Sequence, residues 1–440
     1  MYTCGPTVYD FAHIGNFRTY VFQDLLCRYL ASRGFQVKRV MNITDVDDKT
    51  IAGALREKVT LQEFTRNFTD EFHQDLNTLN ILPPHQELYA TKTIPQMLEI
   101  IKCLIKKGHA YEKDGSVYFR VSSFPRYGML SKKDLEGNIV GARVDQDEYE
   151  KEEGCDFALW KKAKEGEPSW DSPWGRGRPA WHIECSTMSL EVFDGETLDI
   201  HTGGEDLIFP HHENEIAQSE CATGKKFVNY WIHAKHLLVD GEKMSKSKGN
   251  FYTLRDLLKK GFPPNAIRYL LLSTHYRKQL NFTFGGLQAA KEAMRRVYDF
   301  WYNTCQKYGG INGTGGKVGM LGEKAESDFI KALDDDLNIS EALAVIFELV
   351  NKVNAVPSEQ ISTRERTQIE QFLKKVDHVL CVFNLVETEL PPEITQLIAA
   401  RQEARKARDF KRSDQIRLEI KTKGYLIEDA PDGVKVKKIL

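Results

Sequence analysis

Two short segments, 12–16 (AHIGN) and 243–247 (KMSKS), carry the residue types that ATP chemistry needs. The first places an imidazole and an amide three residues apart at the expected start of a helix, whose amino end favours negative charge. Attack of a carboxylate oxygen on ATP with release of pyrophosphate requires positioning and donors that stabilise charge growing on the phosphates. The catalytic candidates are therefore His13, Asn16, Lys243 and Lys246. Taken alone, the lysine loop is equally consistent with a solvated turn.

Glycine and serine residues give both segments the backbone freedom that this chemistry needs. Gly15 permits close approach of the main chain to phosphate, and Gly241 and Gly249 flank a loop that can close when ATP is bound. We therefore add Gly15 and Ser245 to the ATP-binding candidates.

A third group of residues has the types and spacing of a metal site. His211 and Glu215 are four residues apart, so on a helix they share one face. Together with the thiols of Cys4 and Cys185 they would form a shell that is acceptable to zinc. A buried thiol beside a capped helix would give the same pattern, and the sequence leaves both interpretations open.

The hydrophobic pattern predicts the elements that must position these groups. A strand at 2–5, a loop, a helix at 16–33 and a strand at 37–43 form a β-loop-α-β unit. Its right-handed crossover implies a parallel sheet with a ligand crevice at the carboxyl ends of the strands. Mixed sequence from about 90 to 175 predicts an insertion that splits this fold. Apolar stripes after residue 285, at 287–307, 324–332, 339–354 and 363–384, predict a helical bundle.

Composition limits the class of protein. At 440 residues the chain is long enough for about two to four domains. No apolar run approaches the roughly 18 residues that would span a bilayer, and no leader peptide is evident, so we expect a soluble, cytoplasmic protein without a membrane partner. Eight scattered cysteines do not form a disulfide framework.

A net charge of only −2 means that any nucleic-acid partner must be held by a local basic surface. The segment 401–423 carries nine basic against four acidic residues, and we expect it to form one basic helix. Such a helix is either an ordinary solvated face or an RNA-binding surface.

Seven stretches, in order along the whole chain, resemble the cysteinyl-tRNA synthetases, a family of class I aminoacyl-tRNA synthetases. They are 2–10 (YTCGPTVYD), 13–16 (HIGN), 42–49 (NITDVDDK), 181–186 (WHIECS), 201–206 (HTGGED), 209–215 (FPHHENE) and 243–247 (KMSKS). The resemblance implies an α/β fold: a Rossmann-like parallel-sheet catalytic domain split by an insertion, then an α-helical bundle and a small C-terminal domain.

The resemblance also implies the roles of individual residues. Cys4, Cys185, His211 and Glu215 would bind one Zn²⁺, which takes the substrate thiolate and disfavours the hydroxyl of serine. Cys4, Gly5, Thr44 and Trp181 would line the cysteine pocket. Gly203, Gly204 and Asp206 would lie on the adenosine side of an ATP site completed by His13, Gly15, Asn16, Lys243, Ser245 and Lys246, with Mg²⁺ accompanying ATP.

The implied reaction joins ATP and L-cysteine to form cysteinyl-adenylate and then transfers cysteine to the 3′ end of tRNA(Cys), catalysed by a monomer. Arg401, Arg405 and Arg417 would contact the tRNA. The implied domains are a first catalytic part (1–95), a connective insertion (96–178), a second catalytic part (179–225), the KMSKS loop and tRNA stem-contact region (226–288), the helical bundle (289–388) and a basic anticodon-binding domain (389–440).

The sequence differs from the family pattern at two points, and two other functions are compatible with parts of it. The family often has histidine at the position of Asn16, and the chain begins three residues before Cys4, which predicts a first strand short of neighbours. A ligase that joins cysteine to an amino sugar in mycothiol synthesis would share the zinc and nucleotide signatures, but it should not need the basic segment 401–423. A non-catalytic tRNA-binding paralogue would not need His13, Lys246 and the metal ligands.

Overall fold

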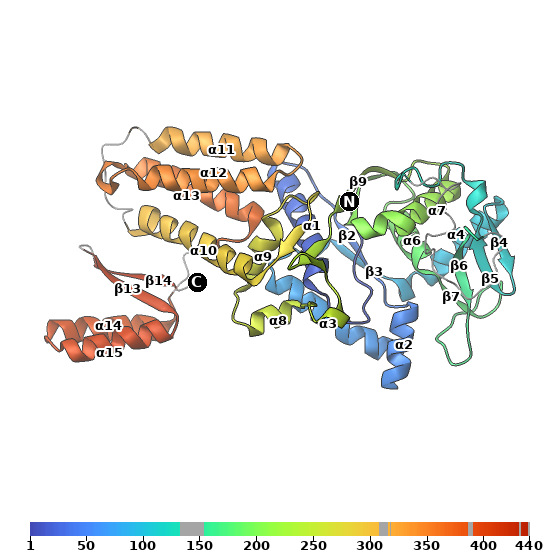
Figure 1. Cartoon of the computed structure of the whole chain (residues 1–440), viewed down its shortest axis with the longest axis horizontal. Helices are drawn as coiled ribbons and strands as arrows, with labels where there is room; N and C mark the ends of the chain where they lie inside the picture. The colour runs from blue at the N-terminus through green and yellow to red at the C-terminus, as the bar shows by residue number, and fades with distance from the viewer. Residues whose placement is uncertain (133–153, 308–315, 317, 386–389, 431–432, 439–440) are drawn as a thin grey trace. The chain divides into compact units, whose positions relative to one another are not determined.

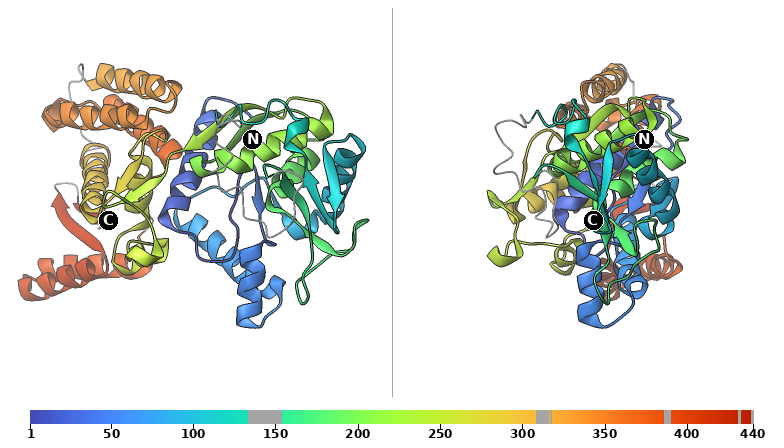
Figure 2. Two further views of the ribbon diagram at one scale, coloured as in Figure 1. Left: turned by 45° about the vertical axis from the view of Figure 1, so that its right-hand side comes forward. Right: turned by 90° about the vertical axis from the view of Figure 1, so that its right-hand side faces the viewer.

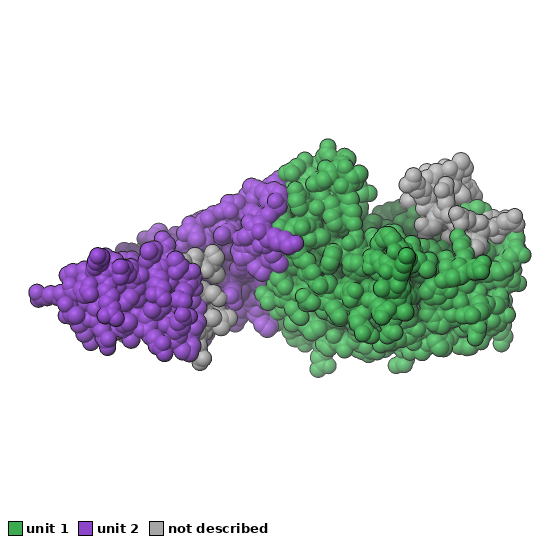
Figure 3. All heavy atoms as spheres, turned by 90° about the horizontal axis from the view of Figure 1, so that it is seen from below, with its two compact units in different colours: residues 1–257, 276–282 green, residues 258–275, 283–440 purple. Residues whose placement is uncertain are grey.

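The computed structural model describes residues 1–132, 154–307, 316, 318–385, 390–430 and 433–438, and Figure 1 shows their helices and strands. The chain divides into two compact units (Figure 3). The first contains residues 1–257 and 276–282, and the second contains residues 258–275 and 283–440.

A five-stranded parallel sheet is the centre of the first unit. Its strands lie in the order β3 (Gln86–Tyr89), β2 (Val40–Ile43), β1 (Tyr2–Thr3), β8 (Leu198–Gly204) and β9 (Val228–Ala234). The first strand is the middle one, because Tyr2 pairs with Val40 on one side and with His201 on the other. The expectation that this strand lacks neighbours was therefore wrong. Because β1, β2 and β8 are parallel neighbours, the residues that follow them lie along one edge of the sheet.

Helices cover this sheet and continue into the insertion. They are α1 (Ile14–Ser32), α2 (Asp48–Glu57), α3 (Leu61–Thr78), α4 (Ile94–Lys106), α6 (Trp181–Val192) and α7 (Glu213–Thr223). Helices α4, α6 and α7 lie side by side (Figures 1 and 2). Segment 181–188 is thus helical.

The insertion carries its own antiparallel sheet. It consists of β4 (Ala110–Lys113), β5 (Ser116–Phe119), β6 (Phe157–Lys162) and β7 (Gly177–Pro179), in that order. Its buried Phe119 and Trp160 belong to the same apolar core as Tyr2 of the central sheet and Ile183 of α6. One continuous core therefore fixes the insertion against the catalytic sheet.

The lysine loop follows a strand of a second, three-stranded sheet. Strand β10 (Leu237–Val239) pairs with β11 (Glu242–Lys243) in a hairpin and with β12 (Leu280–Phe282) in parallel. Helix α8 (Leu254–Lys259) follows the loop.

Among the described residues of the second unit, those from 284 to 380 are mainly helical, as the sequence predicted. The helices of this unit up to residue 380 are α9 (Pro264–Leu272), α10 (Phe284–Trp301), α11 (Val318–Asp334), α12 (Ile339–Asn354) and α13 (Thr363–Leu380). The buried Arg268 of α9 donates to the carbonyl of Leu380, at 2.8 Å, and so satisfies the end of α13. Helix α13 ends earlier than predicted because Cys381 adopts a left-handed backbone (φ +57°).

The basic segment expected as one helix forms two, so that prediction was wrong. Helix α14 (Pro392–Lys406) ends before Arg408, whose φ is +59°, and Asp409 caps α15 (Phe410–Thr422) by accepting from the Arg412 amide at 3.0 Å. The hairpin of β13 (Tyr425–Ala430) and β14 (Gly433–Lys438) follows. Across the described ranges, the helices are all too short or too polar to cross a membrane.

An ion pair fastens α14 to this hairpin. Arg401 is only 3% exposed, and its two terminal nitrogens donate to the two carboxylate oxygens of Asp429, each at 2.9 Å. The hydrogen bonds from Arg401 lower the pKa of Asp429 to about 2. Arg405 pairs with the same carboxylate.

We expect Arg401→Gln to loosen the C-terminal hairpin, because a charge-assisted bidentate pair is lost. Hydrogen exchange of the β13 amides should accelerate by roughly tenfold, which corresponds to about 1.4 kcal/mol of opening free energy. Arg417→Gln, an exposed cation of α15, is the matched control and should leave exchange unchanged. Equal exchange in the two variants would contradict the structural role of Arg401.

Candidate active site

The structure brings the two ATP signatures together, although more than 200 residues separate them. The amide of Ile14 donates to the carbonyl of Tyr252 at 3.0 Å, and His13 forms a β-bridge with Thr253. The ring of Phe251 meets the His13 imidazole edge to face, with centroids 5.3 Å apart. The segment that follows the lysine loop is thus anchored on the start of α1.

His13 and Asn16 form a reciprocal cap at the start of α1. The Asn16 amide donates to His13 Nδ1, and the His13 amide donates to Asn16 Oδ1, each at 3.1 Å. Because Nδ1 accepts a backbone proton, the neutral ring carries its own proton on Nε2. Burial lowers the pKa of His13, so this neutral tautomer is the form present at pH 7. The ring can therefore offer an N–H donor to phosphate without carrying charge.

The lysine loop is held by its own polar contacts. The amide of Ser245 donates to Asn250 Oδ1 at 2.8 Å, and Gly249 supplies a left-handed turn (φ +67°). The Lys246 ammonium forms an ion pair with Asp10 and lies 5.1 Å from the centre of the Phe251 ring. Asp10 therefore holds the ammonium group that is predicted to bind phosphate close to the first signature.

Gly15 has close neighbours from both signatures. A Cβ atom there would lie 3.0 Å from the His13 ring and 3.2 Å from Met244 Cε, so a side chain at this position would require these groups to shift by a few tenths of an ångström. Its contact with phosphate stays a prediction.

Gly203 and Gly204 end β8, and Asp206 lies in the turn after it. The close contacts of both glycines are made by the protein itself. A Cβ on Gly203 would lie 2.9 Å from the His212 ring, and one on Gly204 would lie 2.3 Å from Asp206 Oδ1. The side chains of His212 and Asp206 therefore occupy the space that a side chain at Gly203 or Gly204 would need.

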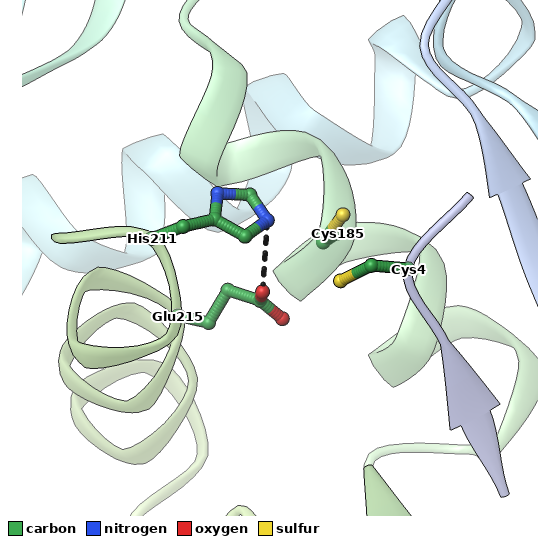
Figure 4. A group of neighbouring side chains, drawn as sticks. All are labelled: Cys4, Cys185, His211 and Glu215. Atoms are coloured by element: carbon green, nitrogen blue, oxygen red, sulfur yellow. Dashed lines mark ion pairs between the residues drawn. The ribbon is translucent and has the colours of Figure 1, made fainter. Parts of the chain in front are cut away.

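The four predicted metal ligands converge in the core (Figure 4). Cys4 follows β1 and Cys185 comes from α6. His211 comes from the π-helical turn Ile208–His212, and Glu215 comes from the first turn of α7, which follows it. One ligand atom from each residue lies within 4.8 Å of all the others, and all four side chains are buried. Atoms bound to one tetrahedral zinc are roughly 3.3 to 3.8 Å apart, so small side-chain movements suffice to bind a metal.

Two groups of this cluster, Cys185 and Glu215, have lowered pKa values, which favours anionic ligands for a metal cation. The hydrogen bond from the Cys4 thiol lowers the pKa of Cys185 to about 6. Burial opposes the ionisation of Glu215, but His201 and His211 outweigh it and lower the pKa of this carboxyl to about 2. A thiolate and a carboxylate are therefore favoured in a dry site. Burial opposes protonation of His211, but Glu215 and Cys185 raise its pKa to about 10, so its imidazolium supplies their counter-charge. A metal that binds His211 would displace this proton.

A second grouping shares two of these residues. His201, His212, Cys4 and Glu215 also bring ligand atoms within 4.8 Å of one another. In it, His201 Nε2 lies 3.0 Å from Glu215 Oε2 and His212 Nε2 lies 3.4 Å from Cys4 Sγ. The set with Cys185 fits zinc better because it supplies two sulfur ligands. His201 and His212 then orient the ligands from outside, as the second layer around metal sites commonly does.

The expected cysteine-pocket residues surround this cluster. The Trp181 ring stacks on His211 with centroids 4.2 Å apart, and a Cβ on Gly5 would lie 1.8 Å from the carbonyl oxygen of Asn42. Thr44 donates to Glu184 Oε2 at 3.0 Å. Sequence reasoning missed Asn42 and Glu184, although both lie inside the stretches 42–49 and 181–186 that were recognised.

The three cations expected to contact tRNA differ in their surroundings. Arg401 is buried and paired with Asp429, and Arg405 shares that partner while it stays exposed. Arg417 is exposed on α15. The ion pair with Asp429 therefore uses two of the three, Arg401 and Arg405, and spacing along the sequence did not reveal this.

Family models cover nearly the whole chain. A model of the class I (C) tRNA synthetase catalytic domain matches residues 1–292, a DALR domain model matches 328–384, and a cysteinyl-tRNA ligase anticodon-binding domain model matches 387–436. Solved structures agree on the fold. A methionyl-tRNA synthetase of Mycobacterium tuberculosis has a TM-score of 0.64 at 14% identity, covering 86% of this chain and 89% of its own.

These matches and the two joined signatures define a class I aminoacyl-tRNA synthetase. Cysteine–tRNA ligases of Protochlamydia amoebophila and Solibacter usitatus are each 50% identical across 100% of this chain and cover 93% and 94% of their own length; that of Chlamydia muridarum is 48% identical, with 100% and 95% covered. The chain belongs to the cysteine–tRNA ligase family.

We expect Cys185→Ser to remove most of the bound zinc, because it replaces a thiolate by a hydroxyl that binds zinc poorly. Zinc per chain, measured by atomic absorption after desalting, should fall from about one to well below one. Cys221→Ser is the matched control, since Cys221 is a buried thiol of α7 outside the cluster. Retention of zinc by the Cys185 variant would rule out this ligand set.

Proposed function

We propose that this chain activates L-cysteine with ATP and transfers it to the 3′ end of tRNA(Cys). The observation that carries the proposal is a buried Cys4, Cys185, His211 and Glu215 cluster at the edge of the sheet where the His13 signature begins α1. Thiol recognition and phosphate chemistry would then lie at the same edge of the sheet. The anticodon-binding domain model at 387–436 supports this activity over the ligation of cysteine to an amino sugar.

We propose Cys4, Cys185, His211 and Glu215 as the holders of one Zn²⁺. The metal would bind the substrate as a thiolate and disfavour the harder hydroxyl of serine. A selectivity of about 10⁴ corresponds to roughly 5.5 kcal/mol, which is more than the ~1 to 3 kcal/mol of one methylene-sized contact. Cys4, Gly5, Thr44 and Trp181 would enclose the rest of the amino acid.

Adenylate formation would rely on positioned donors. A carboxylate oxygen of cysteine attacks the α-phosphorus of ATP, and the bond to the β-phosphate breaks to release pyrophosphate. His13 Nε2–H, Lys243 and Lys246 would stabilise the charge that grows on the leaving group. Asn16, Gly15 and Ser245 would hold the phosphates, with Mg²⁺ bound to them. Gly203, Gly204 and Asp206 would lie on the adenosine side.

In the second step a ribose hydroxyl of the tRNA 3′ end attacks the cysteinyl carbonyl and AMP leaves. The C-terminal domain would bind another part of the same tRNA. Its exposed residues are suited to RNA, since Phe410 is 63% exposed for base stacking. The exposed cations around it are Arg405, Lys406, Arg408, Lys411, Arg412 and Arg417. Cytoplasmic location, a monomeric enzyme and the domain boundaries given by the sequence remain predictions.

We expect Lys246→Ala to lower cysteine-dependent ATP–pyrophosphate exchange by about 10²- to 10³-fold, the loss typical of one donor to developing charge. Cysteine binding, measured by calorimetry, should change little. Lys248→Ala is the matched control, because Lys248 lies in the same loop and pairs with Glu242 at 2.9 Å. Equal losses in exchange and in cysteine affinity would contradict the proposed role.

We expect the double substitution Phe410→Ala and Arg417→Gln to weaken tRNA charging without changing exchange. Loss of one stacking surface and one cation should raise the KM for tRNA by about 10- to 100-fold and flatten its salt dependence. The measurement is charging against tRNA concentration at two ionic strengths. Substitution of Lys324, an exposed cation of α11, by alanine provides the control. Normal charging by the double variant would show that Phe410 and Arg417 do not contact the tRNA.

A further inference from the structure

A single arginine connects the helix after the lysine loop with two other parts of the first unit. Arg255 lies in the first turn of α8 and forms an ion pair with Glu71 of α3, and Figure 1 shows these two helices as neighbours. Its Nε atom lies 3.5 Å from Asp75 Oδ1, also on α3. Its guanidinium group lies 4.8 Å from the centre of the Phe11 ring. Arg255 therefore contacts both α3 and the segment just before the first signature.

The two acidic residues of α3 need this cation. Glu71 and Asp75 are four residues apart and share one face of the helix, where like charges repel. The Asp75 side chain is 5% exposed and that of Arg255 is 28% exposed, so water screens their attraction only in part. Burial raises the pKa of Asp75 to about 7, so its charge is partial at neutral pH. Removal of the guanidinium group would leave two adjacent acids where a cation now joins them to α8.

The aromatic contact suits an arginine in particular. The Phe11 ring packs edge to face on the ring of Phe68 of α3, with centroids 5.4 Å apart. A planar guanidinium group can lie against an aromatic ring while it pairs with carboxylates, which a compact ammonium group does less well. The contacts of Arg255 with α3 and with Phe11 are therefore compatible with each other.

Two consecutive residues before the first signature contact both the lysine loop and the helix that follows it. Asp10 pairs with Lys246 in the loop, and Phe11 contacts Arg255, nine residues further along the chain. The loop and the start of α8 thus rest on the same short segment.

The backbone between the loop and Arg255 is held closely. Thr253 forms a β-bridge with His13. It also caps α8, because its amide donates to Asp256 Oδ2 at 2.9 Å and its hydroxyl oxygen accepts from the Asp256 amide at 3.3 Å. Since Thr253 is two residues from Arg255, a shift of the arginine would move the segment that contacts His13.

We propose that Arg255 is a positioning residue for adenylate formation. By holding the start of α8 against α3 and Phe11, it keeps the lysine loop where Lys243 and Lys246 can reach the phosphates of ATP beside His13. The inference rests on the proposed function, because it takes these lysines as donors to the leaving pyrophosphate. It adds a residue that acts through the loop and not on the substrate itself.

The test measures cysteine-dependent ATP–pyrophosphate exchange by the zinc-loaded full chain at pH 8, above the pKa of Asp75. We expect Arg255→Gln to lower kcat/KM for ATP about tenfold, because a small displacement of the phosphate donors is costly. The KM for L-cysteine should stay within about twofold, and zinc per chain should stay at about one. Lys259→Gln, which removes an exposed cation of the same helix, is the matched control and should leave both kinetic values unchanged.

Two further variants keep the test falsifiable if Arg255→Gln folds poorly. Arg255→Lys retains a cation for Glu71 and should keep exchange within about threefold of the unaltered chain. Glu71→Gln, added to Arg255→Gln, should cause no further loss, because the two residues act as one pair.

Digestion with a lysine-specific protease reports the position of the loop independently of activity. Cleavage after the loop residues Lys243, Lys246 and Lys248 should be about tenfold faster in Arg255→Gln than in the unaltered chain, since the loop then opens more often. The Lys259→Gln control should be cleaved in the loop at the unaltered rate.

A double substitution shows whether Arg255 acts through the loop. In a Lys246→Ala background, Arg255→Gln should lower exchange by about threefold or less, because the main donor that it positions is absent. A full tenfold further loss, unchanged exchange in Arg255→Gln, or equal losses for ATP and cysteine would overturn this inference and leave the proposed function intact. Absence of cysteine-dependent exchange in the unaltered chain would overturn both.

Discussion

The burial of two thiols, an imidazole and a carboxylate at one edge of a parallel sheet is the constraint on which the site depends. Anionic forms of Cys185 and Glu215 are favoured there, and in a dry interior they need a cation beside them, either the His211 imidazolium or a metal that displaces its proton. The residues that meet at this point come from the end of β1, from β8, from α6, and from α7 and the turn before it. The sheet order and the common core that includes the insertion therefore serve to hold these four groups together.

In the proposed phosphate site, the residues expected to bind phosphate also stabilise the local fold. His13 and Asn16 satisfy the amino end of α1, and the same contact selects the neutral tautomer of His13 with its proton on Nε2. Lys246 is held by Asp10 beside that end. Asn16 completes the cap without a charge, so an amide at this position is compatible with donor chemistry that needs no imidazolium.

Much of the architecture could be predicted from local pattern. Apolar stripes predicted α10, α11, α12 and α13 of the second unit, because such stripes are properties of neighbouring residues. The bounds of α12 agree with the prediction, α11 begins six residues earlier than predicted, and α9 was not predicted. The errors arose where a single backbone angle decided the outcome, as at Arg408 in the basic segment and at Cys381 after α13. The position of β1 in the middle of the sheet likewise depends on β8, which lies about 200 residues away in the sequence.

By itself the sequence determined the residue types of the site and their order, because seven recognisable stretches carry the nucleotide signatures and all four metal ligands. Tertiary structure alone decided the partner of each polar group. It buried Arg401 against Asp429, filled the space beside Gly203 and Gly204 with side chains of the protein, and brought Thr44 into a hydrogen bond with Glu184. Hydrogen bonds and charges are satisfied by neighbours in space, and spacing along a chain does not encode which neighbours those are.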